Sequence, residues 1–578
     1  MVCKLLKMNN LRKYITVAII VLVAFIAYGL WTLPSPKDSS SKGFSAERVA
    51  KDIEVISKDF HSVQDPENRL VVRDYLIQRL NSLGADVKLY DYDSVYSKRV
   101  DNTINISNIF CELPPLNSED STYLMLVAHY DSRSVNIVRG DTLNSYGAAD
   151  DGYGVGTILE LLKLAQEYRS EWSQGLKILF TDAEEVGREG MQHLFDHNPE
   201  VFQNVGLLIN LESRGNKGPV LLFETSKNNS ELLKFYKESA NYPFTYTLTS
   251  VVYQFIPNYT DFTVVRDTLC GVNFSNIVDI NHYHTDLDNY DNISLKSIQH
   301  YGEQLSPMVH NYLTDKKYSN VDALKSDSDN VAFTIPLLGM FNFSKGAYYL
   351  VNAIVLALFC LAFSISVIRG RVRPKSMIKV SGVTLLVALG LVVVGELVAY
   401  LVTLIGGSPD SFKLFGVIQG FLCDGTVMIV TISLLAVITF VLYAKKARKI
   451  AISASSGAIR KSASSSATAK FAYNTLYGAL LLLLVISIVL LFAVGENLFT
   501  LIPLAFAICG LILWRVTTLR LFLIVAVAGV LLHSFSFLYC LAIALTLGAF
   551  GVVLMIAFLN LMVLIPLIDL YVRRDKAL

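Results

Sequence analysis

The pattern of apolar and polar residues divides the chain into three parts. Residues 14–31 form an uncharged apolar run, residues 43–330 mix short apolar segments with polar ones, and long apolar stretches fill the chain after residue 345. A membrane-spanning helix needs about 20 consecutive apolar residues. We therefore predict a cytoplasmic tail, transmembrane anchor and linker over 1–42, a globular domain over 43–330, and a membrane bundle over 345–578.

The globular part combines helical and strand periods. Ser45 precedes a helix with apolar residues three or four positions apart, and Asp65-Pro66 precedes another that stops at Gly84. Short apolar runs typical of buried strands occur at 123–128, 176–180, 207–211 and 220–223, with helical stretches such as 155–168 between some of them. Such alternation predicts an α/β domain with a mixed, largely parallel sheet flanked by helices.

The third part predicts a bundle of about seven transmembrane helices. These spans lie at roughly 347–368, 379–405, 415–443, 472–494, 498–514, 520–538 and 543–570. The loops after the first, third, fifth and seventh spans are basic, whereas the opposite loops hold only Asp410, Lys413 and Glu496. Because cytoplasmic loops carry the excess of Lys and Arg, we expect the globular domain on the non-cytoplasmic side.

The first apolar run follows Lys4, Lys7, Arg12 and Lys13, which predicts a helix entered from the cytoplasm. No clear small-residue cleavage site comes after it, so an uncleaved anchor is favoured over a signal peptide. We expect a multi-pass protein of a bacterial inner membrane with a periplasmic domain. A vacuolar or endoplasmic reticulum membrane is the alternative.

The amino-acid composition limits the classes of molecule that the chain is expected to bind. The chain is 53% hydrophobic and 17% charged with a net charge of +1, which gives no support for nucleic acid binding and predicts contact with membrane lipid. Of the seven cysteines, Cys111 and Cys270 lie in the polar region. They could form one disulfide or remain two buried thiols.

Acidic and imidazole side chains follow several predicted strands. His129 and Asp131 come after the first strand, Glu184 and Glu185 after the second, and Glu212 after the third. Asp150 lies in a Gly-Ala-Ala-Asp-Asp-Gly sequence, and His284 occurs late in the domain. Each residue alone has an ordinary structural explanation, since a strand-end His is usually structural and paired acids usually cap a helix. Together they supply the mixed nitrogen and oxygen ligands of an open zinc site at the carboxyl edge of a sheet.

The order of these motifs resembles the co-catalytic di-zinc peptidases that include aminopeptidases and glutamate carboxypeptidases. The resemblance covers residues 44–315 and is carried by His129-x-Asp131, Asp150 in its glycine-rich sequence, Glu184-Glu185, Glu212, and His284-Thr285. The Asn-Leu-Glu-Ser-Arg-Gly sequence around Glu212 and the flanking helices look most like the membrane branch with vacuolar membrane proteases and an endoplasmic reticulum metallopeptidase.

The resemblance implies a zinc exopeptidase fold that binds two zinc ions and acts on peptide substrates. It implies that Asp150 bridges the metals, that His129 and Glu212 complete one site, and that Glu185 and His284 complete the other. A water shared by the two ions would be the nucleophile. The resemblance also implies that Glu184 acts as the general base and that Asp131 orients the His129 ring.

Several alternatives stay open. An aminopeptidase is favoured over a carboxypeptidase, an inactive receptor-like protein, or a glutaminyl cyclase with a reduced metal site. His282 is a rival of His284, and Asp261 either lines the substrate pocket or caps a helix. Three arginines near the motifs could bind a substrate carboxylate: Arg188, Arg214 and Arg266. Glu396 and Asp424 lie inside predicted spans, where buried ionisable groups suggest function, although both could face a shallow aqueous cleft.

Overall fold

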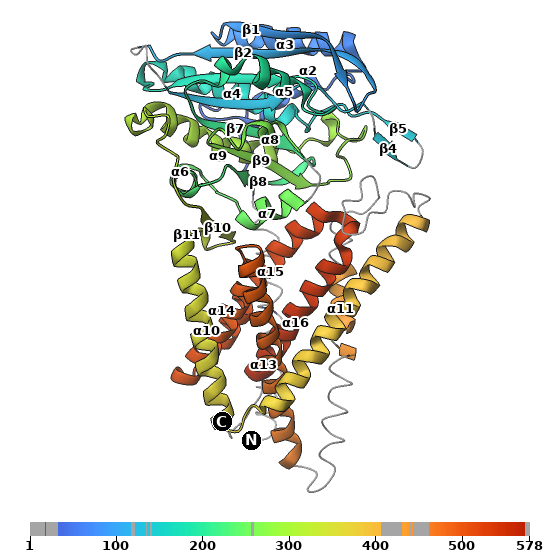
Figure 1. Cartoon of the computed structure of the whole chain (residues 1–578), viewed down its shortest axis with the longest axis vertical. Coiled ribbons are helices and arrows are strands. Elements are labelled where there is room, and N and C mark those ends of the chain that lie inside the picture. The colour runs from blue at the N-terminus through green and yellow to red at the C-terminus, as the bar shows by residue number, and fades with distance from the viewer. Residues whose placement is uncertain are drawn as a thin grey trace.

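The computed structural model describes residues 33–116, 122–134, 136–138, 141–255, 259–405, 431–439, 441–442 and 462–572, together with Ala18. An α/β domain lies at one end of a bundle of long helices (Figure 1). Except for Ala18, the anchor predicted at 14–31 lies outside the described residues. Most of the span predicted at 415–443, including Asp424, also lies outside them.

A seven-stranded sheet forms the centre of the α/β domain. Its strands are β1 (Val87–Ser97), β2 (Asn102–Leu113), β3 (Tyr123–His129), β6 (Gly175–Thr181), β7 (Val205–Ser213), β8 (Lys217–Thr225) and β9 (Gly271–Val278). Their order is β1-β2-β6-β3-β7-β9-β8, in which β6, β3, β7 and β9 run parallel and β1, β2 and β8 pair antiparallel. The predicted mixed, largely parallel sheet is confirmed, and all four predicted strands are present. Strands β1, β2 and β9 were not predicted from the sequence.

Helices cover both faces of this sheet. One face carries α2 (Ala46–Ile56), α3 (Pro66–Ser82), α4 (Gly152–Glu167) and α9 (Leu295–Thr314), and the other carries α5 (Glu189–His197) and α8 (Asp261–Val265). Strand β3 shows why the sheet needs a helical layer on each face. Leu124 and Leu126 pack into the first helical layer, whereas Met125 and Val127 pack into the second. Since successive side chains of a strand point to opposite faces, an unbroken apolar run requires cover on both sides.

The helix starts follow the local sequence. The Ser45 side chain accepts a hydrogen bond from the Arg48 amide at 3.3 Å and caps α2, as the pattern predicted. Asp151 caps α4 in the same way through the Gly154 amide at 3.1 Å. The carboxylate of one member of the Asp150-Asp151 pair is thus used by the helix, and the other is free for chemistry.

Two short hairpins and two further helices complete the domain. Their bounds are β4 (Asn136–Val138), β5 (Asp141–Leu143), α6 (Ser230–Ser239), α7 (Thr247–Phe255), β10 (Asn330–Ile335) and β11 (Gly339–Ser344). The hairpin of β10 and β11 leads directly into the first helix of the bundle (Figure 1).

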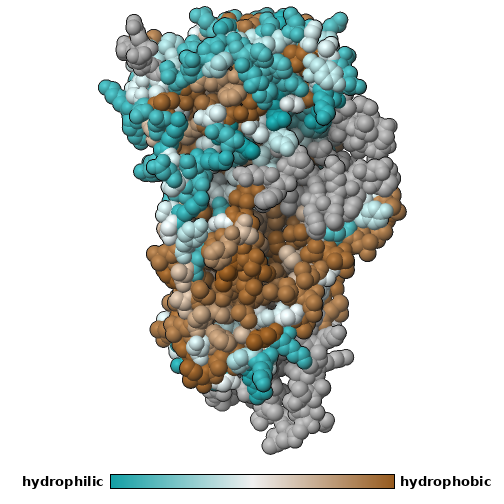
Figure 2. Space-filling view, in the orientation of Figure 1, coloured by the Kyte–Doolittle hydropathy of each residue, from teal (hydrophilic) through white to brown (hydrophobic). Residues whose placement is uncertain are grey.

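The bundle contains six described helices that are long and apolar enough to cross a membrane. They belong to α10 (Lys345–Ile368), α11 (Pro374–Ile405), α13 (Ser462–Ala493), α14 (Leu498–Thr517), α15 (Leu521–Leu545) and the region of α16 (Phe550–Val572). Figure 2 shows an apolar surface around the bundle below a hydrophilic α/β domain. Leu386 is 70% exposed and Phe492 86% exposed on this surface. Large side chains exposed in such numbers fit an apolar solvent, as a membrane protein requires.

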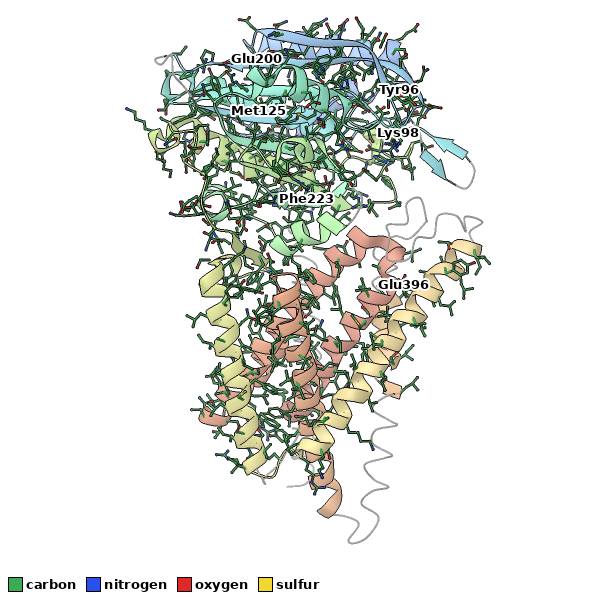
Figure 3. All side chains as sticks on the ribbon, in the orientation of Figure 1. Tyr96, Lys98, Met125, Glu200, Phe223 and Glu396 are labelled. Carbon is green, nitrogen blue, oxygen red and sulfur yellow. The ribbon has the colours of Figure 1, made fainter. Side chains whose placement is uncertain are left out.

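Glu396 is buried where α11 meets the start of α16 (Figure 3). Its Oε1 accepts a hydrogen bond from the Gly551 amide at 3.2 Å. The carboxylate therefore has a structural contact at a helix start, where backbone N–H groups lack partners within their own helix.

The α/β domain contacts the near end of the bundle through a small buried group of side chains. The Tyr246 ring lies 5.6 Å from the Phe537 ring, and its hydroxyl is 3.3 Å from Ser536 Oγ. Beside it, the Thr247 hydroxyl donates to Glu496 Oε2 at 2.9 Å. Glu496 lies in the turn between α13 and α14, so one carboxylate joins the domain to the bundle.

This contact predicts that the Glu496 carboxyl group contributes more to the stability of the chain at acidic pH than at alkaline pH. Burial raises the pKa of Glu496 from 4.5 to about 7. A pKa that is higher in the folded state gives a stability contribution that is complete below the unfolded pKa and is lost as pH rises through about 7. Thermal unfolding of the full chain should therefore show a melting temperature that falls between pH 5 and pH 8 less steeply in Glu496→Gln than in the wild type (roughly the window set by these pKa values).

The exposed residue Glu231 gives a matched control, because Glu231→Gln should keep the wild-type pH slope. If Glu496→Gln also keeps that slope, the carboxylate does not couple the two parts.

Candidate metal centre

Four parallel strands bring the predicted residues to one edge of the sheet. His129 is the last residue of β3, Glu212 is near the end of β7, and Glu185 follows β6 by four residues. His284 follows β9, and Asp150 directly precedes the cap of α4. Because β6, β3, β7 and β9 are neighbours in the sheet, residues distant in the sequence converge at their carboxyl ends.

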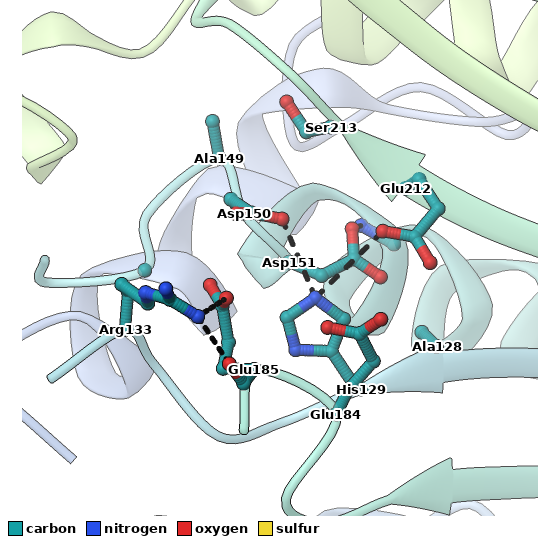
Figure 4. Close-up of polar contacts among 12 residues, drawn as sticks. Ala128, His129, Arg133, Ala149, Asp150, Asp151, Glu184, Glu185, Glu212 and Ser213 are labelled. Atoms are coloured by element: carbon teal, nitrogen blue, oxygen red, sulfur yellow. Dashed lines mark hydrogen bonds and ion pairs between the residues drawn. The ribbon is translucent and has the colours of Figure 1, made fainter. Parts of the chain in front are cut away.

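The five residues form two groups that share Asp150. Figure 4 shows the first of these groups, with His129 between Asp150 and Glu212. In the first, His129 Nε2 lies 3.3 Å from Asp150 Oδ1 and 3.8 Å from Glu212 Oε2. In the second, His284 Nε2 lies 3.2 Å from Asp150 Oδ2 and 3.1 Å from Glu185 Oε2. Within each group the three ligand atoms are within 4.8 Å of one another, and all five residues are buried. Each group could therefore hold a metal ion, and the two carboxylate oxygens of Asp150 face different groups.

The environment of His129 fits a cation between its ring and the carboxylates. Its Nδ1 lies 3.0 Å from the backbone carbonyl oxygen of Asp131, which assigns the proton to Nδ1. The Nε2 lone pair then faces the oxygens of Asp150 and Glu212, and these groups repel one another unless a metal ion or a second proton lies between them. A neutral imidazole oriented by a backbone carbonyl is also the usual form of a metal-binding histidine.

Asp131 holds the Glu184-Glu185 turn in place. Its Oδ1 accepts from the Glu184 amide at 3.0 Å, and its Oδ2 accepts from the Glu185 amide at 3.2 Å. The same carboxylate is 3.6 Å from His129 Nδ1, farther than the Asp131 carbonyl oxygen. Its hydrogen bonds thus connect the end of β3 to the loop after β6. The nearer partner of the His129 ring is the backbone oxygen of Asp131, whereas the expectation named its carboxylate.

Asp288 fixes the loop that carries Asp150, and the sequence analysis missed it. This buried carboxylate accepts from the amides of Ala149 at 2.8 Å and Asp150 at 3.2 Å, and from Asn216 Nδ2 at 3.2 Å. It lies four residues after His284, so its nearness to a motif was the available signal. Its spatial partner in the Asp150 loop is 138 positions away, and no local pattern reveals that.

Arg133 and Tyr283 support the second group of ligands. Arg133 Nη1 lies 3.3 Å from Glu185 Oε2, and the Tyr283 ring stacks on the His284 ring with 3.6 Å between centroids. Burial opposes the ionisation of Glu185, but His284 and Arg133 outweigh it and lower the pKa of Glu185 below its usual range. Glu185 is therefore an ionised carboxylate, the form that binds a cation.

Glu184 has a different environment from its neighbour. It belongs to neither group of ligands among the described residues, yet it lines a cavity together with Asp150 and Glu212. Burial raises the pKa of Glu184 well above its usual range, and the charges of Asp261 and Glu185 add to that effect. A carboxylate with a raised pKa that faces a cavity can accept and return a proton.

The remaining candidates occupy other places. His282 is partly exposed and is absent from both groups, so the geometry selects His284. Asp261 is buried in the first turn of α8, where Thr260 is the capping residue. The Asp261 carboxylate instead accepts a hydrogen bond from the Thr181 hydroxyl. Neither of its two expected roles, pocket lining or helix capping, matches these contacts.

The three arginines near the motifs make different contacts. Arg266 forms an ion pair with buried Glu224 at 2.6 Å, and Arg188 lies 4.7 Å from the ring centre of Tyr259. Arg214 lines the cavity of the candidate site, and its guanidinium has no ion-pair partner in the described part of the chain. Cys111 and Cys270 are both buried free thiols, which decides between the two alternatives for them.

Part of the α/β domain is similar to known peptidases. Residues 108–309 match peptidase family M28. Endoplasmic reticulum metallopeptidase 1 of Mus musculus is 25% identical over 330 residues, which cover 54% of this chain and 35% of that protein. The vacuolar membrane protease of Schizosaccharomyces pombe is 25% identical over 344 residues, which cover 57% of this chain and 37% of that protein.

The chain thus spans about a third of the length of these curated relatives. A Zn-dependent exopeptidase from Parabacteroides distasonis is a similar solved structure, with 18% identity and a TM-score of 0.37, and the match covers 46% of this chain and 99% of that one. All five residues of the acid and imidazole cluster lie within the stretch that matches peptidase family M28.

Proposed function

We propose that the chain is a membrane-bound zinc aminopeptidase that binds two zinc ions and removes residues from the amino end of peptides. One observation carries the proposal: two groups of ligands share the carboxylate of Asp150. A bridged pair of metal ions needs a ligand with two oxygens aimed at separate positions, and Asp150 provides it. His129 and Glu212 would hold one ion, and Glu185 and His284 the other.

Zinc fits the donor set better than harder metal ions. Two imidazoles with three carboxylates are mixed nitrogen and oxygen ligands, whereas magnesium and calcium prefer oxygen alone. When bound, zinc would polarise the scissile carbonyl and make water a stronger acid.

Glu184 is the proposed general base. Its raised pKa and its place in the cavity suit it to take a proton from the attacking water and pass it to the leaving amine. Asp131 would act as a positioning residue, because its carboxylate holds the backbone of the Glu184-Glu185 turn.

The choice of peptide end rests on charge in the cavity. Asp150 and Glu212 line its inner end as proposed zinc ligands, so a bound zinc ion there could take up the free amine of a substrate directly. Glu184 is the one acid of the lining that is not a proposed ligand. Arg214 supports the second candidate, a carboxypeptidase, because it offers a guanidinium in the same cavity, and the peptide ends can be tested separately.

We also propose that the α/β domain lies on the non-cytoplasmic side of a membrane and that the helix bundle contacts its lipid. The support is the basic character of alternate loops, including Arg369, Arg371 and Arg373 after α10. Peptides delivered to that compartment would be its substrates.

A matched pair of neighbouring substitutions tests the metal centre. Purified wild-type protein should contain about two zinc ions per chain, since each ligand group holds one. Glu184→Gln should keep that metal content and lose activity by about 100-fold or more, because a general base is removed and no ligand is. Glu185→Gln should lose zinc, because a ligand oxygen is replaced. Elemental analysis with an aminoacyl-anilide assay measures both quantities.

The opposite pattern, with zinc lost in Glu184→Gln and kept in Glu185→Gln, would exchange their roles. If the wild-type protein stays free of metal after zinc is supplied, the proposal that the chain is a zinc peptidase is wrong.

Blocking one end of a peptide at a time tests the direction of cleavage. We expect an N-acetylated peptide to resist hydrolysis, because it lacks the free amine, while a C-amidated peptide is cleaved like the free one. Product analysis by mass spectrometry gives the result. Cleavage that survives acetylation and stops on amidation would favour the carboxypeptidase, and Arg214→Ala should then abolish it.

Labelling of introduced cysteines tests the orientation. An impermeant thiol reagent added outside intact cells should label a cysteine at Ser40 in the linker and leave one at Ser455 unlabelled. Labelling of the cysteine at Ser455 alone would show that the orientation is the opposite of the one proposed.

A further inference from the structure

The cavity of the candidate site extends from the acid and imidazole cluster to a membrane helix. Asp150, Glu184 and Glu212 line one end of it. Residues of α15 line another part of the same cavity: Phe537, Cys540 and Leu541. The reactive groups and a membrane-spanning helix thus face a common space.

The rest of the cavity lining is mostly apolar, and its small polar members are Ser213, Thr249, Thr260 and Ser275. Strands β8 and β9, helix α7 and the segment before it contribute Leu221, Phe223, Tyr246, Leu248, Tyr253 and Ile277. Figure 3 places Phe223 on the side of the α/β domain that faces the bundle. The charged residues of the lining, the three acids and Arg214, all belong to the cluster or its immediate sequence neighbourhood. A group that reaches past them meets only uncharged side chains.

The contribution of α15 is held from both sides. Phe537 contacts the Tyr246 ring of the α/β domain at 5.6 Å and stacks on Phe499 of α14 at 6.1 Å. The Tyr246 hydroxyl reaches Ser536, also on α15. Tyr246 and Phe537 are both buried. This part of α15 is therefore packed against the α/β domain.

We infer that this cavity binds a large apolar side chain of the terminal substrate residue, and that membrane helix α15 forms part of the binding wall. The inference rests on the proposed peptidase function, which places the terminal residue at the cluster. An apolar lining that adjoins the reacting groups favours residues such as leucine over alanine, since each additional methylene leaves water on binding. The bundle then takes part in substrate selection as well as in anchoring.

Filling the cavity from the side of α15 tests this role. Leu541→Trp adds bulk to the lining, and Val525→Trp on the same helix is the control, because Val525 is 50% exposed on the bundle surface. Both are made in the full chain together with Glu184→Gln, which retains substrate without turnover. Titration calorimetry then compares the binding of Leu-Ala-Ala and Ala-Ala-Ala after zinc is supplied.

We expect Leu541→Trp to weaken binding of Leu-Ala-Ala by about 10-fold or more and binding of Ala-Ala-Ala by much less, because the loss of a pocket for several carbons is worth at least that factor. Val525→Trp should change neither. Phe537→Ala provides an independent variant, since a larger cavity should strengthen the preference for phenylalanine over leucine at the first position.

Equal loss of both peptides in Leu541→Trp, or no discrimination between them in any variant, would overturn the inference; a cavity filled by lipid would give the latter result. Failure of the peptidase proposal looks different, because the wild type would then bind the two peptides with the expected preference and hydrolyse neither.

Discussion

The structure depends on burying several carboxylates within a few ångströms of one another at the carboxyl edge of the sheet. Asp150, Glu185 and Glu212 are all buried, and their oxygens lie 3.1 to 3.8 Å from the nitrogens of His129 and His284. Negative charge concentrated away from water is costly unless positive charge compensates it. Arg133 pairs with one of these carboxylates. A metal ion in each group of ligands, as the proposed function requires, would compensate the remainder and so stabilise this arrangement as well as supply chemistry.

The surrounding fold keeps these ligands in position. Asp131 accepts hydrogen bonds from two amides of the turn after β6, and Asp288 accepts from two amides of the loop before α4. Both loops lack a sheet partner of their own, so these carboxylates supply the order that hydrogen bonds of a strand would otherwise provide. Side chains that hold ligands are often as important for metal affinity as the ligands themselves.

Features with a local signal could be predicted from the sequence. Strands β3, β6 and β7 are mostly apolar runs, interrupted only by Lys177 in β6 and Asn210 in β7 before their polar ends. His129, Glu185 and Glu212 lie at or just after the ends of these strands, so the position of the cluster followed from strand order. Strands β1 and β2 have alternating polar residues and lie at an antiparallel edge, where the apolar signal is weak. Asp288 and the cavity wall formed by Phe537 depend on contacts between residues more than a hundred positions apart, and local patterns do not contain them.

Locating the metal ions themselves tests the shared carboxylate most directly. A crystal structure with anomalous diffraction recorded at the zinc absorption edge should show two peaks, both within bonding distance of Asp150. One should lie about 2.0–2.1 Å from His129 Nε2 and the other at the same distance from His284 Nε2. A single peak, or two peaks of which only one contacts Asp150, would contradict the account.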